Sequence, residues 1–402
     1  MNANPHANTP YGAGQRTAVL NAEVNSSVEK LMFTLEARAC AADQQRDYAE
    51  AQRALEHSGL LSLRVPAQAG GVFISQSEAI DITRRVAQAD PGVAQLLQPH
   101  YGFTDTIELL PVATQAILYR DVLRGVRIAS AASERGGKHS ADFATTLLRQ
   151  GDGYVIQGTK YYATGSVGAG WITVIGRNEL GGQALAWVRA DAQGLKVIDD
   201  WNGMGQRGSS SGTVMLDNVV VPADYVVPVW DIGHRALAWH ESGRLIHAAI
   251  DLGIAEGALG WGLRQVASDT RIPFESPYAT LASDPVLQYQ IGTLSAQILA
   301  AGALLDNTAQ LLDRVQTMHP DDYLLLQSQL AAIKALAAEV SLQTSSDVFS
   351  WSGARAADRK LRVDRYWRNA RTHTLHDPVR LRYQELGQQL LRVFTAEQGA
   401  AQ

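Results

Sequence analysis

The chain has 402 residues, of which 46% are hydrophobic and only 19% are charged, so it is long enough to form two or three domains with buried cores. Its 35 basic and 40 acidic residues give a net charge of −5. This balance excludes a broad basic surface of the kind that binds nucleic acid or an anionic membrane. The single cysteine, Cys40, excludes an intrachain disulfide and zinc sites built on paired thiolates.

Neither a secretion signal nor a membrane-spanning helix is predicted. Residues 1–16 are polar and rich in Asn, Pro and Gly, unlike a signal peptide. The longest apolar stretch, residues 291–305, is interrupted by Thr293, Ser295 and Gln297, whereas a spanning helix needs about 20 apolar residues. We therefore expect a cytoplasmic protein with no membrane or nucleic-acid partner.

The pattern of apolar residues changes twice along the chain. Residues 16–124 follow helical spacing, interrupted by prolines. Over residues 126–221, short runs rich in β-branched and aromatic residues alternate with glycine-containing turns, which is typical of strands. Helical spacing then returns, with long segments at 285–315 and 321–349. Helices on both sides of a small β module predict an α+β fold with segregated layers.

These changes divide the chain into predicted parts. A polar tail is expected to be disordered, and two helical domains flank the β domain. The parts are residues 1–17 (tail), 18–126 (N-terminal helical domain), 127–236 (middle β domain) and 237–402 (C-terminal helical bundle). The strands expected within the β domain are residues 144–149, 154–164, 171–176, 184–189, 195–199 and 212–221.

Three segments of the β domain combine hydroxyl side chains with glycines. Residues 130–137 and 161–166 offer hydroxyls and open backbone that suit the rim of a planar ligand. Residues 201–212 begin with Trp201, which can stack on an aromatic ring, and continue into a Ser- and Gly-rich run beside Arg207 that suits a phosphate. Each segment, taken alone, also fits an ordinary polar turn.

The C-terminal segment 364–378 concentrates basic and aromatic residues around two histidines. Pro378 would lie in the first turn of a closing helix with Asp377 as its N-cap. Two histidines and a carboxylate suit iron, but His376 and Asp377 are adjacent and rarely reach one ion, so no metal is predicted. A histidine that donates a hydrogen bond or a proton is favoured. His100, taken alone, fits a buried structural histidine better than a catalytic one.

Together these segments resemble the acyl-CoA dehydrogenase superfamily over residues 20–395. The resemblance is closer to one branch, the flavin-dependent monooxygenases typified by dibenzothiophene monooxygenase and the sulfur-acquisition oxidoreductases, whose C-terminal signature looks like residues 365–378. It implies an N-terminal helical domain, a β-barrel-like middle domain and a C-terminal four-helix bundle. It also implies a homotetramer.

This resemblance implies a monooxygenase that uses O2 and reduced FMN, supplied by a separate NAD(P)H:flavin reductase. A C4a-peroxy adduct of the flavin would oxygenate a small apolar substrate, and the family neighbours suggest an organosulfur compound. The residues implied at the flavin are Ser130, Thr164, Trp201, Ser211, Arg271 and His373. The residues implied in catalysis are His376, His100 and Thr164, with His376 as the first choice to protonate or stabilise the adduct.

Other functions remain open on the same fold. An FAD-dependent acyl-CoA dehydrogenase would need a carboxylate base, and Glu241 and Asp377 are the candidates nearest the expected positions. Residues 350–355 leave little room for the pyrophosphate and adenosine of FAD, which favours FMN. An N-oxygenase of amines and a flavin-binding protein without turnover are the remaining alternatives.

Overall fold

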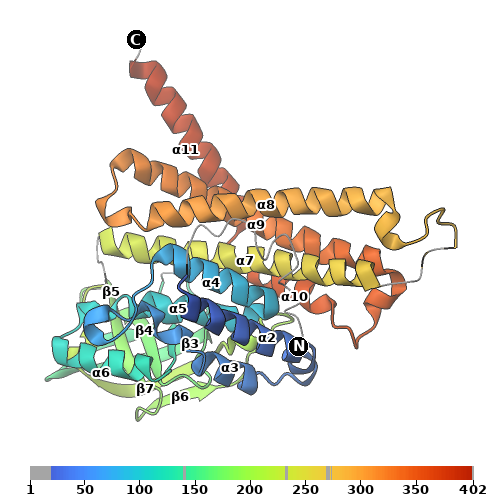
Figure 1. Ribbon diagram of the computed structural model, residues 1–402. Coiled ribbons are helices and arrows are strands. Elements are labelled where there is room, and N and C mark those ends of the chain that lie inside the picture. Colours follow the sequence, from blue (N-terminus) through green and yellow to red (C-terminus); the bar gives the residue numbers. More distant parts are fainter. Residues whose placement is uncertain (1–19, 139–141, 231–233, 269–271, 273, 401–402) are drawn as a thin grey trace.

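The computed structural model describes residues 20–138, 142–230, 234–268, 272 and 274–400 (Figure 1). The tail expected at residues 1–17 and the predicted flavin ligand Arg271 lie outside these ranges. None of the helices within them is long and apolar enough to cross a bilayer.

Capping residues begin the N-terminal helices at defined positions. Asn21 caps the first of them by accepting the N–H of Val24 at 2.9 Å. Ser75 and Glu78 form a reciprocal capping box, and Asp90 caps the next helix. The helices are α2 (Ala22–Gln45), α3 (Ala49–Glu56), α4 (Gln76–Ala89), α5 (Pro91–Thr104) and α6 (Val112–Leu123), with a 3₁₀ turn at Leu60–Arg64.

The strands of the described residues form one sheet in the order β6-β7-β3-β2-β4-β5-β8, with β1 parallel to β4. The predicted strands are all present, with ends shifted by one or two residues. Two short strands, β1 and β8, were not predicted. The bounds are β1 (Ile128–Ala131), β2 (Thr146–Gln150), β3 (Gly153–Ala163), β4 (Trp171–Arg177), β5 (Gln183–Arg189), β6 (Leu195–Ile198), β7 (Gly212–Pro222) and β8 (Val226–Val227).

The C-terminal part is helical, as expected. Helix α9 packs against α7, α8 and α11, and Figure 1 shows α11 extending away from the rest of the molecule. Helix α11 begins at Val379, so Pro378 precedes the helix instead of lying within its first turn. The helices are α7 (His234–Ser268), α8 (Pro285–Leu312), α9 (Pro320–Ser352), α10 (Asp364–His373) and α11 (Val379–Ala400).

Glycines let helices α4 and α7 approach closely. A Cβ atom added at Gly253 would lie 2.3 Å from the carbonyl oxygen of Arg84, and one added at Gly257 would lie 2.4 Å from that of Gln88. No larger residue fits there without moving one helix away from the other. This contact fixes the N-terminal helices against the C-terminal ones.

Helix α5 lies between the sheet and α7. It contacts β1 on one side and α7 on the other, and nearly all of its residues are buried. A Cβ atom at Gly92 would lie 2.7 Å from the backbone nitrogen of Gly208, so the start of α5 touches the loop before β7. Side chains of α5 can therefore reach both the edge of the sheet and the C-terminal helices.

Candidate active site

Ser130 and Thr164 meet at one edge of the sheet. Ser130 lies on β1 and Thr164 directly follows β3, and the N–H of Ser130 donates to the carbonyl of Thr164 at 3.1 Å. Both residues are half-buried. The hydroxyl residues that the resemblance implied at a flavin therefore do lie side by side, at the edge of the sheet that faces α5.

Trp201 and Tyr162 form an aromatic wall beside this edge. Their rings are nearly perpendicular, at 85°, with centroids 6.1 Å apart. The indole N–H of Trp201 donates to the carbonyl of Gln206 at 2.8 Å, which holds the ring against its own loop. The guanidinium of Arg135 lies 5.0 Å from the ring centroid of Tyr162, whose side chain is half exposed.

Gln206 was missed by the sequence analysis. Its backbone is left-handed, with φ at 53°, and its side chain is buried. Neither the oxygen nor the nitrogen of its amide has a hydrogen-bond partner among the described residues. Left-handed backbone and an unpartnered buried amide both cluster at functional sites, so Gln206 joins Trp201 as part of the candidate site.

The loop that carries Trp201 lies directly on α10. The side chain of Asn369 accepts the N–H of Gln206 at 2.6 Å, and Arg368 donates to the carbonyl of Met204 at 2.8 Å. A Cβ atom at Gly205 would lie 2.0 Å from the carbonyl oxygen of Arg368. The sheet's loop and the helix that leads to His373 are therefore packed directly against each other.

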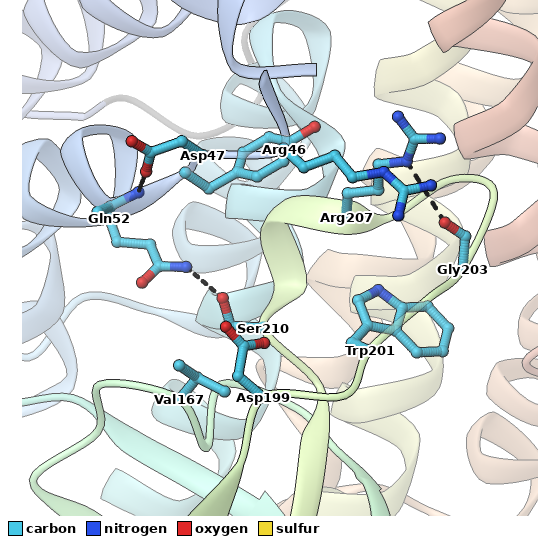
Figure 2. Close-up of a pocket in the computed structure, with 11 residues that line it drawn as sticks. Arg46, Asp47, Gln52, Val167, Asp199, Trp201, Gly203, Arg207 and Ser210 are labelled. Carbon is cyan, nitrogen blue, oxygen red and sulfur yellow. Dashed lines mark hydrogen bonds between the residues drawn. The ribbon is translucent and has the colours of Figure 1, made fainter. Parts of the chain in front are cut away.

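A cavity of about 180 Å³ adjoins Trp201 (Figure 2). In Figure 2 the side chains of Arg46 and Arg207 extend toward Gly203, with Trp201 beside them. Arg207 is ion-paired with Asp43 at 3.4 Å. The lining residues are Arg46, Asp47, Tyr48, Ala49, Gln52, Val167, Asp199, Trp201, Gly203, Arg207 and Ser210.

Ser211, implied at the flavin phosphate, is buried next to this cavity. Its hydroxyl forms a hydrogen bond with the hydroxyl of Ser209 at 2.8 Å. Ser210 between them has left-handed backbone, with φ at 48°, and its hydroxyl accepts from the amide of Gln52. The Ser–Gly run is thus a tight turn whose hydroxyls already form hydrogen bonds within the protein.

Four polar side chains from four helices meet around His373. The Nδ1 of His373 lies 2.5 Å from the Oδ1 of Asp251, whose Oδ2 lies 2.5 Å from the Nζ of Lys334. The Nε2 of His373 lies 3.0 Å from the Oε1 of Gln95. All four side chains are buried. Lys334 and His373 hold the pKa of the Asp251 carboxyl below its usual value, although burial opposes them.

His247 extends this network to His376. Its Nδ1 lies 3.1 Å from the Nε2 of His373, and its ring centroid lies 4.1 Å from that of His376 with the planes inclined by 33°. Burial lowers the pKa of His247 well below its usual value. His376 is exposed, yet the dense protein on its other sides lowers its pKa to about 4, and His373 and Lys334 add to this effect. Both rings are neutral at pH 7.

His100 lies apart from this cluster. It is fully buried, its Nε2 lies 2.8 Å from the carbonyl oxygen of Leu61, and its Nδ1 accepts the N–H of Ile128 at 3.1 Å. Burial lowers its pKa to about 4. Both nitrogens are used within the protein, and the ring has no exposed edge toward a ligand.

The two carboxylates considered as a dehydrogenase base are both ion-paired. Glu241 is buried and lies 3.0 Å from Arg244, and Asp377 lies 3.3 Å from Arg382. A paired carboxylate is a weaker base, because removal of a proton by it must disrupt a favourable charge pair. Within the described part of the chain, no group of His, Cys, Asp or Glu side chains is arranged to hold a metal ion.

The structure therefore groups the implied residues into two sets. Ser130, Thr164 and Trp201 gather at the sheet edge, while His373 ends α10 and His376 follows it in the next segment. Gln95, His247, Asp251 and Lys334 were missed by the sequence analysis. The available signal was the spacing of His247 and Asp251, which lie four residues apart in the otherwise apolar stretch 245–255 of α7 and so share one face of the helix.

Comparisons with known proteins agree with this architecture. The acyl-CoA dehydrogenase middle domain matches residues 129–219, and the acyl-CoA dehydrogenase C-terminal domain matches residues 245–380. Dibenzothiophene monooxygenase of Rhodococcus qingshengii is 30% identical over 355 residues, which cover 84% of this chain and 85% of that protein. A probable FMNH2-dependent monooxygenase of Pseudomonas putida, SfnC, is 28% identical over 83% of this chain and 86% of its own.

A solved structure shares the fold closely. FMN-bound TdsC from Paenibacillus sp. A11-2 superposes with a TM-score of 0.86 at 26% identity, over 92% of this chain and 97% of that one. Fold and matches together define a flavin-dependent oxidoreductase. The chain belongs to the acyl-CoA dehydrogenase superfamily, in its flavin-dependent monooxygenase branch. The resemblance seen in the sequence is confirmed.

Proposed function

We propose that this protein is a two-component monooxygenase that uses reduced FMN and O2 to oxygenate a small apolar substrate, with organosulfur compounds as the substrate class. The observation that carries this proposal is the pairing of a hydroxyl-lined, aromatic sheet edge with an exposed neutral histidine at the end of α10. The names of the relatives support it, because they include dibenzothiophene monooxygenases and an FMNH2-dependent enzyme. A separate NAD(P)H:flavin reductase would supply the reduced flavin.

The residues at the sheet edge fit a flavin. Ser130 and Thr164, two hydroxyl residues, are joined through their backbones, and Trp201 offers an aromatic surface fixed by its bond to Gln206. The unpartnered amide of Gln206 adds a polar group that has no use within the described protein. When bound, the reduced flavin would supply the electrons that activate O2, and a C4a-peroxy adduct is the oxidant that the family resemblance implies.

His376 is the residue that we assign to the proton and charge of this reaction. It is the exposed member of the histidine cluster, and its low pKa keeps it neutral at pH 7. A neutral imidazole can donate one hydrogen bond or accept one, whereas a cation could only donate. His100 we assign to positioning, because its two hydrogen bonds join the 3₁₀ turn at Leu61 to β1 at Ile128.

The competing acyl-CoA dehydrogenase function has less support. Each candidate base is neutralised by an arginine, so neither carboxylate is free to remove a proton. Addition of an acyl-CoA to the flavin-loaded protein under anaerobic conditions tests this directly. We expect the oxidised flavin spectrum to stay unchanged, and bleaching would favour the dehydrogenase.

The decisive experiment mixes the protein with reduced FMN anaerobically and then with oxygenated buffer in a stopped-flow spectrophotometer. We expect a transient flavin species that free FMN does not form, followed by product from an aromatic sulfide. Reoxidation as fast as free flavin, or a preference for FAD, would contradict the proposal. A panel of sulfides, sulfones and amines then separates an S-oxygenase from an N-oxygenase.

We also propose that four copies of the chain assemble. Helix α11 exposes Leu390, Leu391 and Phe394 by 60%, 67% and 59%, and such apolar surface marks an interaction site. Light scattering should give a mass near four times the 43.4 kDa of one chain. A mass equal to one chain would contradict the assembly.

A further inference from the structure

The contacts Lys334–Asp251 and Asp251–His373 form a continuous buried chain. His247 connects this chain to the exposed His376. Lys334 comes from α9, Asp251 from α7 and His373 from α10, so three helices supply one buried unit. Lys334 is 1% exposed and Asp251 is fully buried. Burial of two opposite charges costs several kcal/mol per ion, and a hydrophobic pair of the same volume is often as stable. The stability of the fold alone is therefore a weak explanation for the presence of the Lys334–Asp251 ion pair.

The carboxylate determines which nitrogen of His373 carries a proton. Asp251 is ionised, and a carboxylate can only accept hydrogen bonds. Because Nδ1 lies 2.5 Å from that carboxylate, Nδ1 must donate. In this form the opposite nitrogen, Nε2, can only accept, so the Nδ1–H of His247 donates to it at 3.1 Å. The side-chain amide of Gln95, whose Oε1 lies 3.0 Å away, must then turn its NH2 group toward Nε2.

His247 connects this nitrogen to the site. Its Nδ1 is bonded to His373, so its ring has one orientation, and that ring packs against His376 at a centroid distance of 4.1 Å. A change in the proton on His373 would change the hydrogen bond to His247. The altered hydrogen bond would then change the orientation of the His247 ring, against which His376 packs.

We propose that Asp251, held by Lys334, is a positioning residue that fixes the Nδ1–H form of His373 and thereby orients His247 and His376. The inference rests on the proposed function only for its effect on turnover. The proton on His373 is a property of the protein without flavin. Neutralising an orienting carboxylate leaves its shape in place but allows the wrong tautomer. Outer-shell residues that orient a histidine change activity by roughly 10- to 100-fold.

The test uses the full chain labelled with ¹⁵N-histidine, without flavin. The His373 signals, assigned by comparison with His373→Gln, should show a protonated Nδ1 in the wild type. Asp251→Asn should shift this proton toward Nε2, because an asparagine amide can donate to Nδ1. Glu134→Gln is the matched control, since it also breaks a buried lysine–carboxylate pair, Lys160–Glu134 at 2.6 Å, which joins β3 to the segment after β1.

Turnover gives the second readout. Asp251→Asn should lower the rate of product formation roughly 10- to 100-fold with FMN affinity unchanged. In the His373→Gln background the same substitution should have no further effect, because Asp251 acts through His373. An additive loss, or an unchanged His373 spectrum in Asp251→Asn, would overturn the inference.

The two proposals fail in different ways. If the wild type shows an unprotonated Nδ1 on His373, the positioning role is wrong whatever the enzyme oxidises, and this result does not depend on the Asp251→Asn variant. If the spectrum agrees but no oxygenation occurs, the proposed function is wrong and the tautomer assignment stands.

Discussion

The carboxylate of Asp43 holds the guanidinium of Arg368 through two parallel hydrogen bonds, at 2.6 and 3.0 Å. The two residues are 325 positions apart and join α2 to α10. Arg207 and Arg362 also lie within 4 Å of the same carboxylate. One buried acid thus holds three arginines, and one of these belongs to the loop that carries Trp201.

Asp43→Asn should destabilise the protein and loosen this loop. Removing one partner leaves guanidinium groups without their counter-charge, so we expect a loss of about 3 kcal/mol in the free energy of unfolding. FMN affinity should fall as well, because Arg207 of the loop at Trp201 loses its ion pair with α2. Urea denaturation and a flavin titration measure the two effects. Asp191→Asn is the control, since its pair with Arg189 is exposed and contributes less than about 1 kcal/mol.

Trp201→Ala should weaken FMN binding roughly tenfold, because the aromatic wall and the hydrogen bond to Gln206 are both lost. Trp201→Phe keeps a ring and loses only the N–H, so its affinity should lie between those of the wild type and Trp201→Ala. Fluorescence titration with FMN measures all three. If affinity held while product formation failed, Trp201 would act in the chemistry and not in flavin packing. Leu180→Ala, on an exposed turn, should bind FMN like the wild type.

His376→Ala should leave FMN affinity within about twofold while product formation falls at least tenfold, because a proton-transfer or charge-stabilising group is typically worth that much. Single-turnover product yield and a flavin titration separate the two effects. His57→Ala removes an exposed histidine on another helix and is the matched control. Unchanged product formation in His376→Ala would remove this residue from the mechanism.

Acid should destabilise the fold between pH 6.5 and 4. Burial lowers the pKa of His100 to about 4 from 6.5, so the unfolded chain binds more protons than the folded one in this interval. The contribution is therefore complete above pH 6.5 and is lost as the pH falls toward 4. For one such group the loss from pH 7.5 to pH 5 is about 2 kcal/mol.

His100→Gln tests this assignment. The variant should be less stable than the wild type at pH 7.5, because both ring hydrogen bonds change. Its free energy of unfolding should then fall by about 2 kcal/mol less than that of the wild type on going to pH 5. Urea denaturation at the two pH values gives the difference. Parallel losses in both proteins would show that His100 does not titrate in this range.

The elements of the fold were predictable from local patterns. Alternating and β-branched runs located β2 to β7, and helical spacing located α8 and α9 within a few residues. The short strands β1 and β8 were missed because Ile128–Ala131 shows no clear alternation of apolar and polar residues and β8 has only two residues. β1 exists only because its backbone pairs with Trp171–Val174 of β4, a contact across more than forty residues.

The site was predictable only in part. Unusual residue runs pointed to Trp201, His373 and His376, and the structure places these at the sheet edge and at the end of α10. The same runs could not show that Ser211 bonds to Ser209, since a Ser–Gly loop and a tight turn have the same composition. They also could not show that both ring nitrogens of His100 form hydrogen bonds with backbone groups of distant segments.

By itself the sequence determined the order of helices and strands, the family and the histidines at the end of α10, because each of these depends on neighbouring residues or on a contiguous motif. Only the tertiary structure decided the partners of those histidines. Gln95 comes from α5, His247 and Asp251 come from α7, and Lys334 comes from α9, so these polar side chains meet from three separate helices. Which of them meet is determined by how closely the helices pack, and that depends on contacts between residues far apart in the chain, such as Gly253 against Arg84.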